Sequence, residues 1–319
     1  MKILQISLIL TLIFHQIYSS ELEQQQSPLE IELPDTKTEY IKILCLNRKT
    51  GEFLKTSLDN NELLDSVINV NQTTVFIIHG WTENPNLTFF DNLPEAFSKF
   101  TEWNICNVNW SPLASKDILR AYQSTYFVNT FLADFIIDLT AKKKIKLDQI
   151  VLVGHSFGAQ IAAFCGMQLN GKLGAIYALD PIAPQLTPTS ALYTQCILTE
   201  TGMFRSAIGH CETNFYVNGG QSQPICHNSN DPLCSHRVSV LYFIFSLNVR
   251  NQFLCRSCKF KVFNVFCFYE EIDLMGIYSQ RKIGSFDCFT TNQPPFTNHF
   301  IESENLTNVT HPTQNSNYI

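Results

Sequence analysis

The segment IVLVGHSFGAQIAAFC, residues 150–165, contains the pattern that decides the fold. Residues 150–153 are apolar and mostly β-branched, as in a buried strand, and residues 159–165 favour a helix. Between them lies a G-x-S-x-G pentapeptide centred on Ser156. A strand, a sharp turn and a helix around such a serine are typical of a nucleophile elbow, in which the hydroxyl projects above the end of a sheet. We therefore predict that Ser156 is a nucleophile. The alternative is an ordinary glycine-rich turn in an α/β protein.

Strands and helices alternate along most of the chain. Short apolar runs predict buried strands, and runs with helical spacing, including a long one expected to be capped by Ser115, predict helices between them. This alternation favours a mostly parallel α/β sheet with helices on both faces. An edge strand is expected at 40–46, two antiparallel strands at 193–200 and 214–218, and a closing helix at 236–248.

The two ends of the chain differ in composition from its centre. Residues 1–19 combine Lys2 with an apolar core and small residues near Ser19, which predicts a secretion signal. Residues 20–38 form a polar leader, 39–289 one domain, and 290–319 a flexible polar tail. Secretion to the extracellular space agrees with 11 cysteines. It also agrees with glycosylation motifs at Asn71, Asn86, Asn305 and Asn308.

The charge balance excludes some classes of partner. With 22 Lys and Arg against 28 Asp and Glu, the formal net charge is −6. A nucleic-acid partner requires a basic face, so none is expected. Beyond the predicted signal, no segment is long and apolar enough for a transmembrane helix.

The cysteines are expected to form disulfides, with one thiol left over. Cys165, inside the elbow helix, is the candidate free thiol. Cys196 with Cys211, and Cys45 with Cys106, are candidate pairs, whereas the pairing within 255–288 stays open. A zinc site at Cys255-x-x-Cys258 is an alternative, but it lacks a second pair of ligands. We therefore predict no metal and no cofactor.

A catalytic serine needs a histidine as its base and a carboxylate to orient that histidine. In α/β-hydrolase folds these residues follow the order serine, acid, histidine. His236 lies two residues after Cys234, at the start of a predicted helix. Asp180 ends the strand after the elbow, where the functional side chains of parallel sheets gather. Asp231 is too close to His236 in sequence. We predict a triad of Ser156, Asp180 and His236, although each residue alone could be structural.

The oxyanion formed during acyl transfer requires two backbone donors. The amide of Phe157, which follows the serine, is one candidate. The second is the amide of Trp81, in the loop that follows the strand ending at His79-Gly80. Trp81 could also line an acyl pocket, or be a packed core aromatic.

Seven short motifs resemble the secreted animal lipases of the pancreatic lipase superfamily, and the chain is most similar to the arthropod phospholipase A1-like members. They lie between residues 40 and 285, at 79–81 (HGW), 108–111 (VNWS), 154–159 (GHSFGA), 179–181 (LDP), 215–220 (FYVNGG), 223–226 (QPIC) and 234–237 (CSHR). The resemblance implies an α/β-hydrolase fold and hydrolysis of lipid esters, with the predicted triad at the family's triad positions. No C-terminal β-sandwich domain is expected, because the chain ends too early for one.

By the same resemblance, Cys226 and Cys234 form a disulfide that brackets the lid. The loop 227–233 contains Pro232, and only Leu233 is strongly apolar, so we predict a small lid that leaves the site open in water. A lid of this kind favours phospholipase A1 activity at a lipid interface, with hydrolysis of the sn-1 ester of phosphoglycerides. The alternatives are a triacylglycerol lipase, a catalytically weak lipid-binding or storage relative, and an esterase for small soluble esters.

Overall fold

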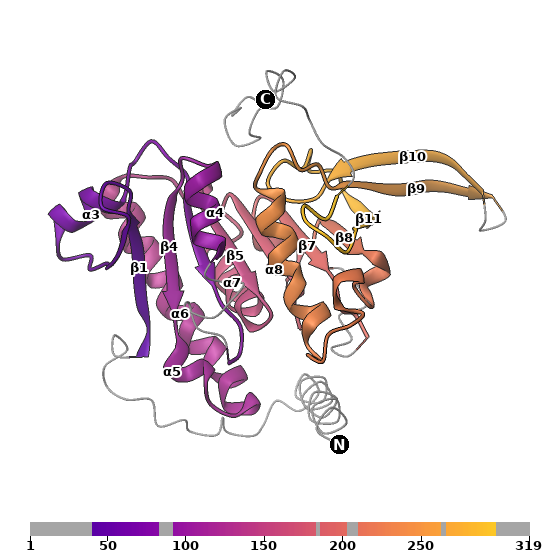
Figure 1. Cartoon of the computed structure of the whole chain (residues 1–319). Coiled ribbons are helices and arrows are strands. Elements are labelled where there is room, and N and C mark those ends of the chain that lie inside the picture. The colour runs from indigo at the N-terminus through magenta and orange to yellow at the C-terminus, as the bar shows by residue number, and fades with distance from the viewer. Residues whose placement is uncertain (1–39, 83–91, 183–185, 203–209, 263–265, 298–319) are drawn as a thin grey trace, which may run out of the picture.

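The computed structural model describes residues 40–82, 92–182, 186–202, 210–262 and 266–297, and the side chains of 258–269 are outside this description. The described strands form one sheet of eleven strands in the order β10-β9-β11-β8-β7-β6-β5-β3-β4-β1-β2 (Figure 1). The strands are β1 Lys42–Asn47, β2 Glu52–Lys55, β3 Thr74–Ile78, β4 Asn104–Asn109, β5 Ile150–His155, β6 Ala175–Leu179, β7 Thr194–Leu198, β8 Thr213–Val217, β9 Leu254–Val262, β10 Phe266–Leu274 and β11 Gly284–Cys288. The α-helices are α3 Asn61–Val67, α4 Asn92–Phe100, α5 Ser111–Ala114, α6 Ile118–Lys143, α7 Phe157–Gln168 and α8 Cys234–Ser246.

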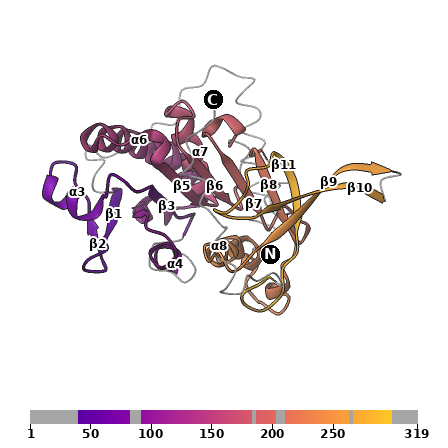
Figure 2. The ribbon, with the colours of Figure 1, turned by 90° about the horizontal axis from the view of Figure 1, so that it is seen from above.

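The centre of the sheet is parallel. From β4 through β3, β5, β6, β7 and β8 to β11, each neighbouring pair runs in the same direction, and antiparallel pairing is confined to the β1–β2 and β9–β10 sides. Helices α6 and α7 cover one face, while α4 and α8 cover the other (Figure 2). This is the α/β-hydrolase architecture that the sequence predicts. The described residues after α8 add β9, β10 and β11 to this sheet and form no separate β-sandwich.

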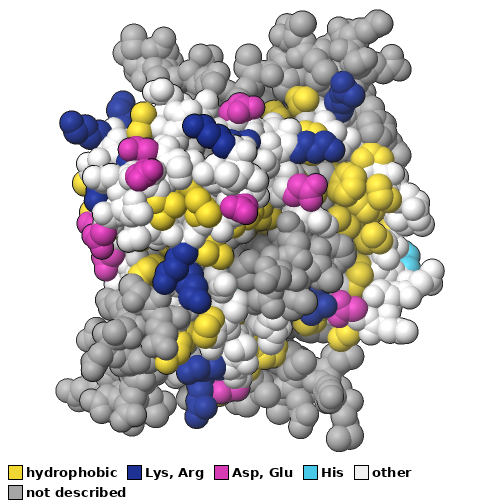
Figure 3. Space-filling model, turned by 60° about the vertical axis from the view of Figure 1, so that its left-hand side comes forward, with side chains coloured by type: hydrophobic (Ala, Val, Ile, Leu, Met, Phe, Trp, Pro, Cys, Tyr) yellow, Lys and Arg dark blue, Asp and Glu magenta, His cyan; other side chains and the backbone are white. Residues whose placement is uncertain are grey.

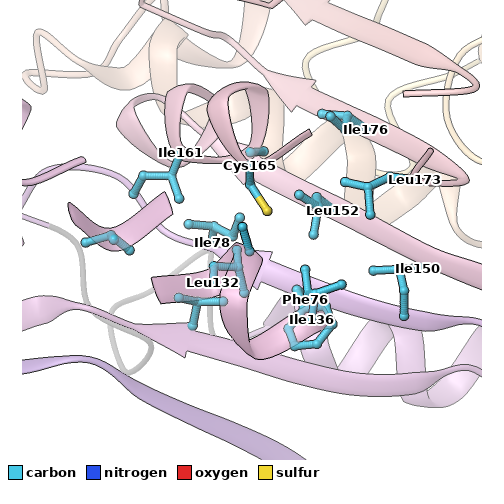
Figure 4. Packing of buried hydrophobic residues seen from close by; sticks show 14 of the residues in the cluster. Phe76, Ile78, Leu132, Ile136, Ile150, Leu152, Ile161, Cys165, Leu173 and Ile176 are labelled. Carbon is cyan, nitrogen blue, oxygen red and sulfur yellow. The ribbon is translucent and has the colours of Figure 1, made fainter. Parts of the chain in front are cut away.

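Each face of the sheet supports its own hydrophobic core. Side chains alternate along a strand, so Phe76 and Ile78 of β3 point to the α6–α7 side, whereas Val75 and Ile77 point to the α4–α8 side. The side chains of β5 also alternate between the two cores, so both of its faces are buried and its sequence is continuously apolar. Figure 4 shows the first core, in which Cys165 of α7 packs among aliphatic side chains.

Strands β7 and β8 are parallel, and the prediction that they are antiparallel was wrong. The described residues that precede β8 lie beside β7, where a Cys196–Cys211 disulfide and a hydrogen bond from the Glu212 amide to Thr194 Oγ1 (2.8 Å) hold them. Because β8 therefore begins beside the beginning of β7, the two strands point in the same direction. Short apolar runs alone do not encode this direction.

Two smaller expectations also require correction. Strand β1 is not at the edge of the sheet, because the turn at Gly51 (φ 77°) reverses the chain and β2 pairs outside it. Ser115 does not cap the long helix. It ends α5, and Asp117 caps α6 by accepting a hydrogen bond from the Arg120 amide (3.1 Å).

The cysteines whose side chains the structure describes form four disulfides and leave Cys165 free. Cys165 and three of the pairs are as predicted, whereas the sequence left the Cys255–Cys288 pairing open. Burial raises the pKa of the Cys165 thiol, so it stays protonated and inert. Cys255 bonds to Cys288, which excludes its sulfur from a zinc site. The four disulfides are Cys45–Cys106, Cys196–Cys211, Cys226–Cys234 and Cys255–Cys288.

Among the described residues on the face drawn in Figure 3, acidic and basic side chains are interspersed and form no continuous basic surface. Asn71, at one of the predicted glycosylation motifs, is exposed. Within the described parts of the chain, no helix is both long and apolar enough to cross a bilayer. The predicted signal, the leader and the tail beyond residue 297 lie outside the described residues, and their boundaries stay predictions.

Gly158 allows α7 to contact the end of β3 through backbone atoms. A Cβ at this position would lie 2.1 Å from the Ile78 carbonyl oxygen and 2.8 Å from the His79 carbonyl oxygen. These are backbone atoms within a packed core and cannot move aside independently. The second glycine of the pentapeptide therefore brings two loops of the sheet edge together.

We expect Gly158→Ala to lower the free energy of unfolding by about 1–3 kcal/mol, because α7 must separate from β3 to admit the methyl group. Urea unfolding followed by circular dichroism measures this loss. Gly202→Ala is the matched control, because its Cβ meets only the end of the Glu200 side chain, at 3.1 Å. Equal unfolding midpoints for the two variants would contradict the close contact.

Candidate active site

Ser156 occupies the turn between β5 and α7. Its backbone has φ 56° and ψ −119°, a conformation that L-residues rarely adopt. The Ser156 amide donates to the Leu179 carbonyl (3.0 Å), which fixes the turn against the end of β6. Strain at a buried serine that heads a helix is the geometry of a nucleophile elbow, and α7 directs its positive dipole end toward this turn.

Asp180 and His236, 56 residues apart, meet at the same edge of the sheet. His236 Nδ1 donates to Asp180 Oδ2 over 2.6 Å, and both side chains are buried. The other carboxylate oxygen, Asp180 Oδ1, accepts hydrogen bonds from the amides of Thr199 (2.8 Å) and Glu200 (2.9 Å). The carboxylate is thus held by three donors, and one of its oxygens is reserved for the histidine.

The His236 ring lies beside the elbow. Its centroid is 4.5 Å from that of His155, the residue that precedes Ser156, and His155 Nε2 bonds to the His236 carbonyl (3.2 Å). Since Asp180 receives the proton on His236 Nδ1, the neutral ring keeps Nε2 as an acceptor. An imidazole oriented in this way can take a proton from a hydroxyl.

The structure therefore brings the three predicted residues to one edge of the sheet: Ser156 and Asp180 directly follow β5 and β6, and His236 lies in the first turn of α8. It also identifies residues that the sequence analysis did not include: His155, and the amides of Thr199 and Glu200. His155 was visible as the second residue of the pentapeptide. The two amides carry no signal in the sequence, because any residue type supplies a backbone N–H.

The His79-Gly80-Trp81 loop is held next to the elbow. The buried Trp110 indole donates to the His79 carbonyl (2.9 Å), and the two rings stack with centroids 5.4 Å apart. Trp81 is half-buried, and its indole donates to the Lys116 carbonyl (2.8 Å). Together with the close contact at Gly158, these hydrogen bonds hold the loop that contains Trp81 next to the start of α7, where Phe157 lies.

The loop between Cys226 and Cys234 is short and polar. The Cys226–Cys234 disulfide closes it, and it contains turns but no helix. Residues 227–230 are exposed, and Arg237 of α8 binds Asp231 at 2.7 Å. Leu233 alone packs against the core. The loop therefore presents little apolar surface above the site.

Stability measurements can separate the contribution of the Asp180 oxygen that binds the two amides from that of the oxygen that binds His236. We expect Asp180→Ala to lower the free energy of unfolding by about 2–4 kcal/mol, because the amides of Thr199 and Glu200 and the His236 ring lose their acceptor. Asp180→Asn keeps an oxygen for the two amides, so its loss should be less than half as large. Thermal and urea unfolding of both variants measure this difference, and equal losses would show that the amide contacts contribute nothing.

Comparison with known proteins places this chain in a family. Residues 11–288 match the lipase family. Lipase member H of Rattus norvegicus is 34% identical over 199 residues, which are 56% of this chain and 43% of that protein. Phospholipase A1 4 of Polistes dominula is 30% identical over 226 residues, which are 63% of this chain and 70% of that protein.

Among solved structures, esterase PE8 is 19% identical with a TM-score of 0.32, over 40% of this chain and 67% of that chain. This chain matches less than half the length of Lipase member H of Rattus norvegicus. The family match, in contrast, extends over most of the chain. This protein therefore belongs to the lipase family, the family of the pancreatic lipases, as its motifs predict.

Proposed function

We propose that this protein is a serine hydrolase of carboxylic esters that acts on lipids, with Ser156, Asp180 and His236 as its catalytic triad. The observation that carries the proposal is the buried hydrogen bond between His236 and Asp180, placed beside a serine in an elbow conformation. Membership of the lipase family and relatives named as lipases and phospholipases support it.

In the proposed reaction, Ser156 Oγ attacks the ester carbonyl carbon while its proton passes to His236 Nε2. Asp180 stabilises the resulting imidazolium. The tetrahedral intermediate then collapses, the bond to the alcohol oxygen breaks, and His236 returns the proton to that oxygen. Water repeats the sequence on the acyl-enzyme, which releases the fatty acid and restores the serine hydroxyl.

We assign the oxyanion hole to the backbone amides of Phe157 and Trp81. Phe157 is the first residue of α7, so its amide has no partner within the helix. The close contact of Gly158 with Ile78 and His79 supports the second donor, because it holds the Trp81 loop against the same turn. Preorganised donors of this kind typically contribute about 10²- to 10³-fold to the rate.

We expect Ser156→Ala to lower the rate of ester hydrolysis by at least about 10³-fold and to abolish labelling by a fluorophosphonate probe. The wild-type protein should carry the label on the peptide that contains Ser156, as determined by mass spectrometry. Ser66→Ala, at an exposed helical serine, is the control and should keep both properties. A label on another residue, or hydrolysis by Ser156→Ala at the wild-type rate, would refute the triad.

For the substrate, we propose phospholipase A1 activity at a lipid interface, with hydrolysis of the sn-1 ester of phosphoglycerides. The short polar loop 227–233 supports this choice, because it leaves room above the serine and offers little apolar surface to an acyl chain. The similarity to a Polistes dominula protein named phospholipase A1 agrees. Neutral triacylglycerol is the second candidate, because the rat relative is named only as a lipase.

Substrate preference is measured by fatty-acid release from phosphatidylcholine vesicles and from triolein emulsions. We expect release from the sn-1 position of phosphatidylcholine to be the faster reaction, because its head group requires an open, polar entrance. Vesicles with a non-hydrolysable sn-1 ether are the control and should yield no fatty acid. Rapid triolein hydrolysis without release from phosphatidylcholine would reverse the assignment.

A lipid-binding or storage role without turnover is a further alternative, beside an esterase for small soluble esters. The bond between His236 and Asp180 favours an enzyme, because a protein that only binds lipid has no need of an oriented imidazole. We further propose that the protein is secreted, which the apolar segment after Lys2 and the four disulfides of the described residues support.

A further inference from the structure

We propose that Gln223 is a positioning residue, which holds Asp180 in its catalytic orientation through a single peptide group. This inference rests on the proposed triad and extends it to a residue that touches neither substrate nor the reacting atoms. The geometry that points to it is a chain of hydrogen bonds from the base of the loop 227–233 to the carboxylate.

Gln223 and Asp180 bind opposite ends of the peptide that links Thr199 to Glu200. Gln223 Nε2 donates to the Thr199 carbonyl oxygen at 2.8 Å. The amide in the same peptide group, that of Glu200, donates to Asp180 Oδ1 at 2.9 Å. A hydrogen bond at the carbonyl polarises the peptide and makes its N–H a stronger donor, an effect that is largest where water is excluded. Gln223 therefore orients and strengthens one of the bonds that hold the carboxylate.

The Gln223 side chain is itself fixed. It is fully buried, its amide nitrogen also donates to the Val217 carbonyl (2.8 Å), and its Oε1 accepts from Asn218 Nδ2 (2.7 Å). Both donors and the acceptor of the carboxamide are thus engaged. Only a side chain with two N–H groups and one oxygen at this length can make these three bonds, so the position requires glutamine.

Gln223 also contacts the segment that carries the histidine. Its backbone amide donates to Ser235 Oγ (3.1 Å), and Ser235 is adjacent to His236 at the start of α8. One residue therefore joins the loop that supports the acid to the helix that carries the base. Movement of either would change the distance between Asp180 and His236, and an error of about 1 Å in such a pair can cost up to about 100-fold in rate.

The test replaces Gln223 with methionine, which keeps the length of the side chain and removes its hydrogen bonds. We expect kcat for a soluble ester to fall about 10- to 100-fold, with KM changed less than about twofold. The downfield proton signal of His236 Nδ1–H in the NMR spectrum should broaden or shift. In an Asp180→Asn background the same substitution should have no further effect on kcat, because the carboxylate that it positions is gone.

Gln195 provides the matched control. It is also a fully buried glutamine that donates twice and accepts once, with Tyr193 and Gly276 as its partners, and it does not contact Asp180 or Thr199. Gln195→Met removes the same kinds of bond and should destabilise the protein, yet leave kcat within about twofold of wild type and leave the NMR signal unchanged. Where either methionine variant fails to fold, the asparagine variants Gln223→Asn and Gln195→Asn, which keep the carboxamide but cannot reach the same partners, give the same comparison.

Three results would overturn the inference. They are a kcat for Gln223→Met equal to that of Gln195→Met, an unchanged His236 signal, or a fall in kcat on adding Gln223→Met to Asp180→Asn as large as the fall it causes in the wild-type protein. Failure of the proposed function is distinguishable from these results. If Ser156→Ala still hydrolyses esters, the triad itself is wrong, whereas an inactive Ser156→Ala together with a fully active Gln223→Met refutes only the role of Gln223.

Discussion

The hydrogen bond from His236 to Asp180 constrains the rest of the structure, because it places a carboxylate inside the protein. A buried charge is costly unless several donors satisfy it. Here the amides of Thr199 and Glu200 supply two donors and the imidazole the third. These amides come from the loop after β7, so that loop must remain fixed relative to both β6 and α8. The hydrogen bonds from Gln223 to the Thr199 carbonyl and to Ser235 help to fix the loop in this position.

Parallel strand order brings the site together. Strands β3, β5, β6 and β7 are neighbours and run in one direction, so their carboxyl ends lie at a single edge. Each end contributes one component: the His79 loop, the serine turn, the aspartate and the two amides. Only the histidine comes from a helix, and the Cys226–Cys234 disulfide fixes the chain immediately before it. Residues of the proposed triad that are distant in sequence thus become neighbours, because the strands that precede Ser156 and Asp180 lie side by side in the sheet.

The sequence predicted the elements with strong local patterns and missed those set by tertiary contacts. The apolar runs of β3, β5 and β6 and the glycines around Ser156 identify their own structures. The order of serine, aspartate and histidine selected three residues that the fold places at one edge. The direction of β8 depends on a disulfide that returns the chain to the start of β7, and the cap of α6 depends on where α5 ends. Neither constraint is local, so periodicity could not reveal them.

The loop above the site connects substrate entry to catalytic geometry. Its disulfide and the Asp231–Arg237 ion pair restrain its two ends, and it is too short and too polar to form an apolar cover. A long lid can open at an interface and rearrange the site as it moves. This loop, in contrast, is anchored at Cys234, two residues before His236, and at Cys226, three residues after Gln223. Large opening motions would disturb the base and its support together. A connection this short and polar therefore favours a site that is already assembled before substrate arrives.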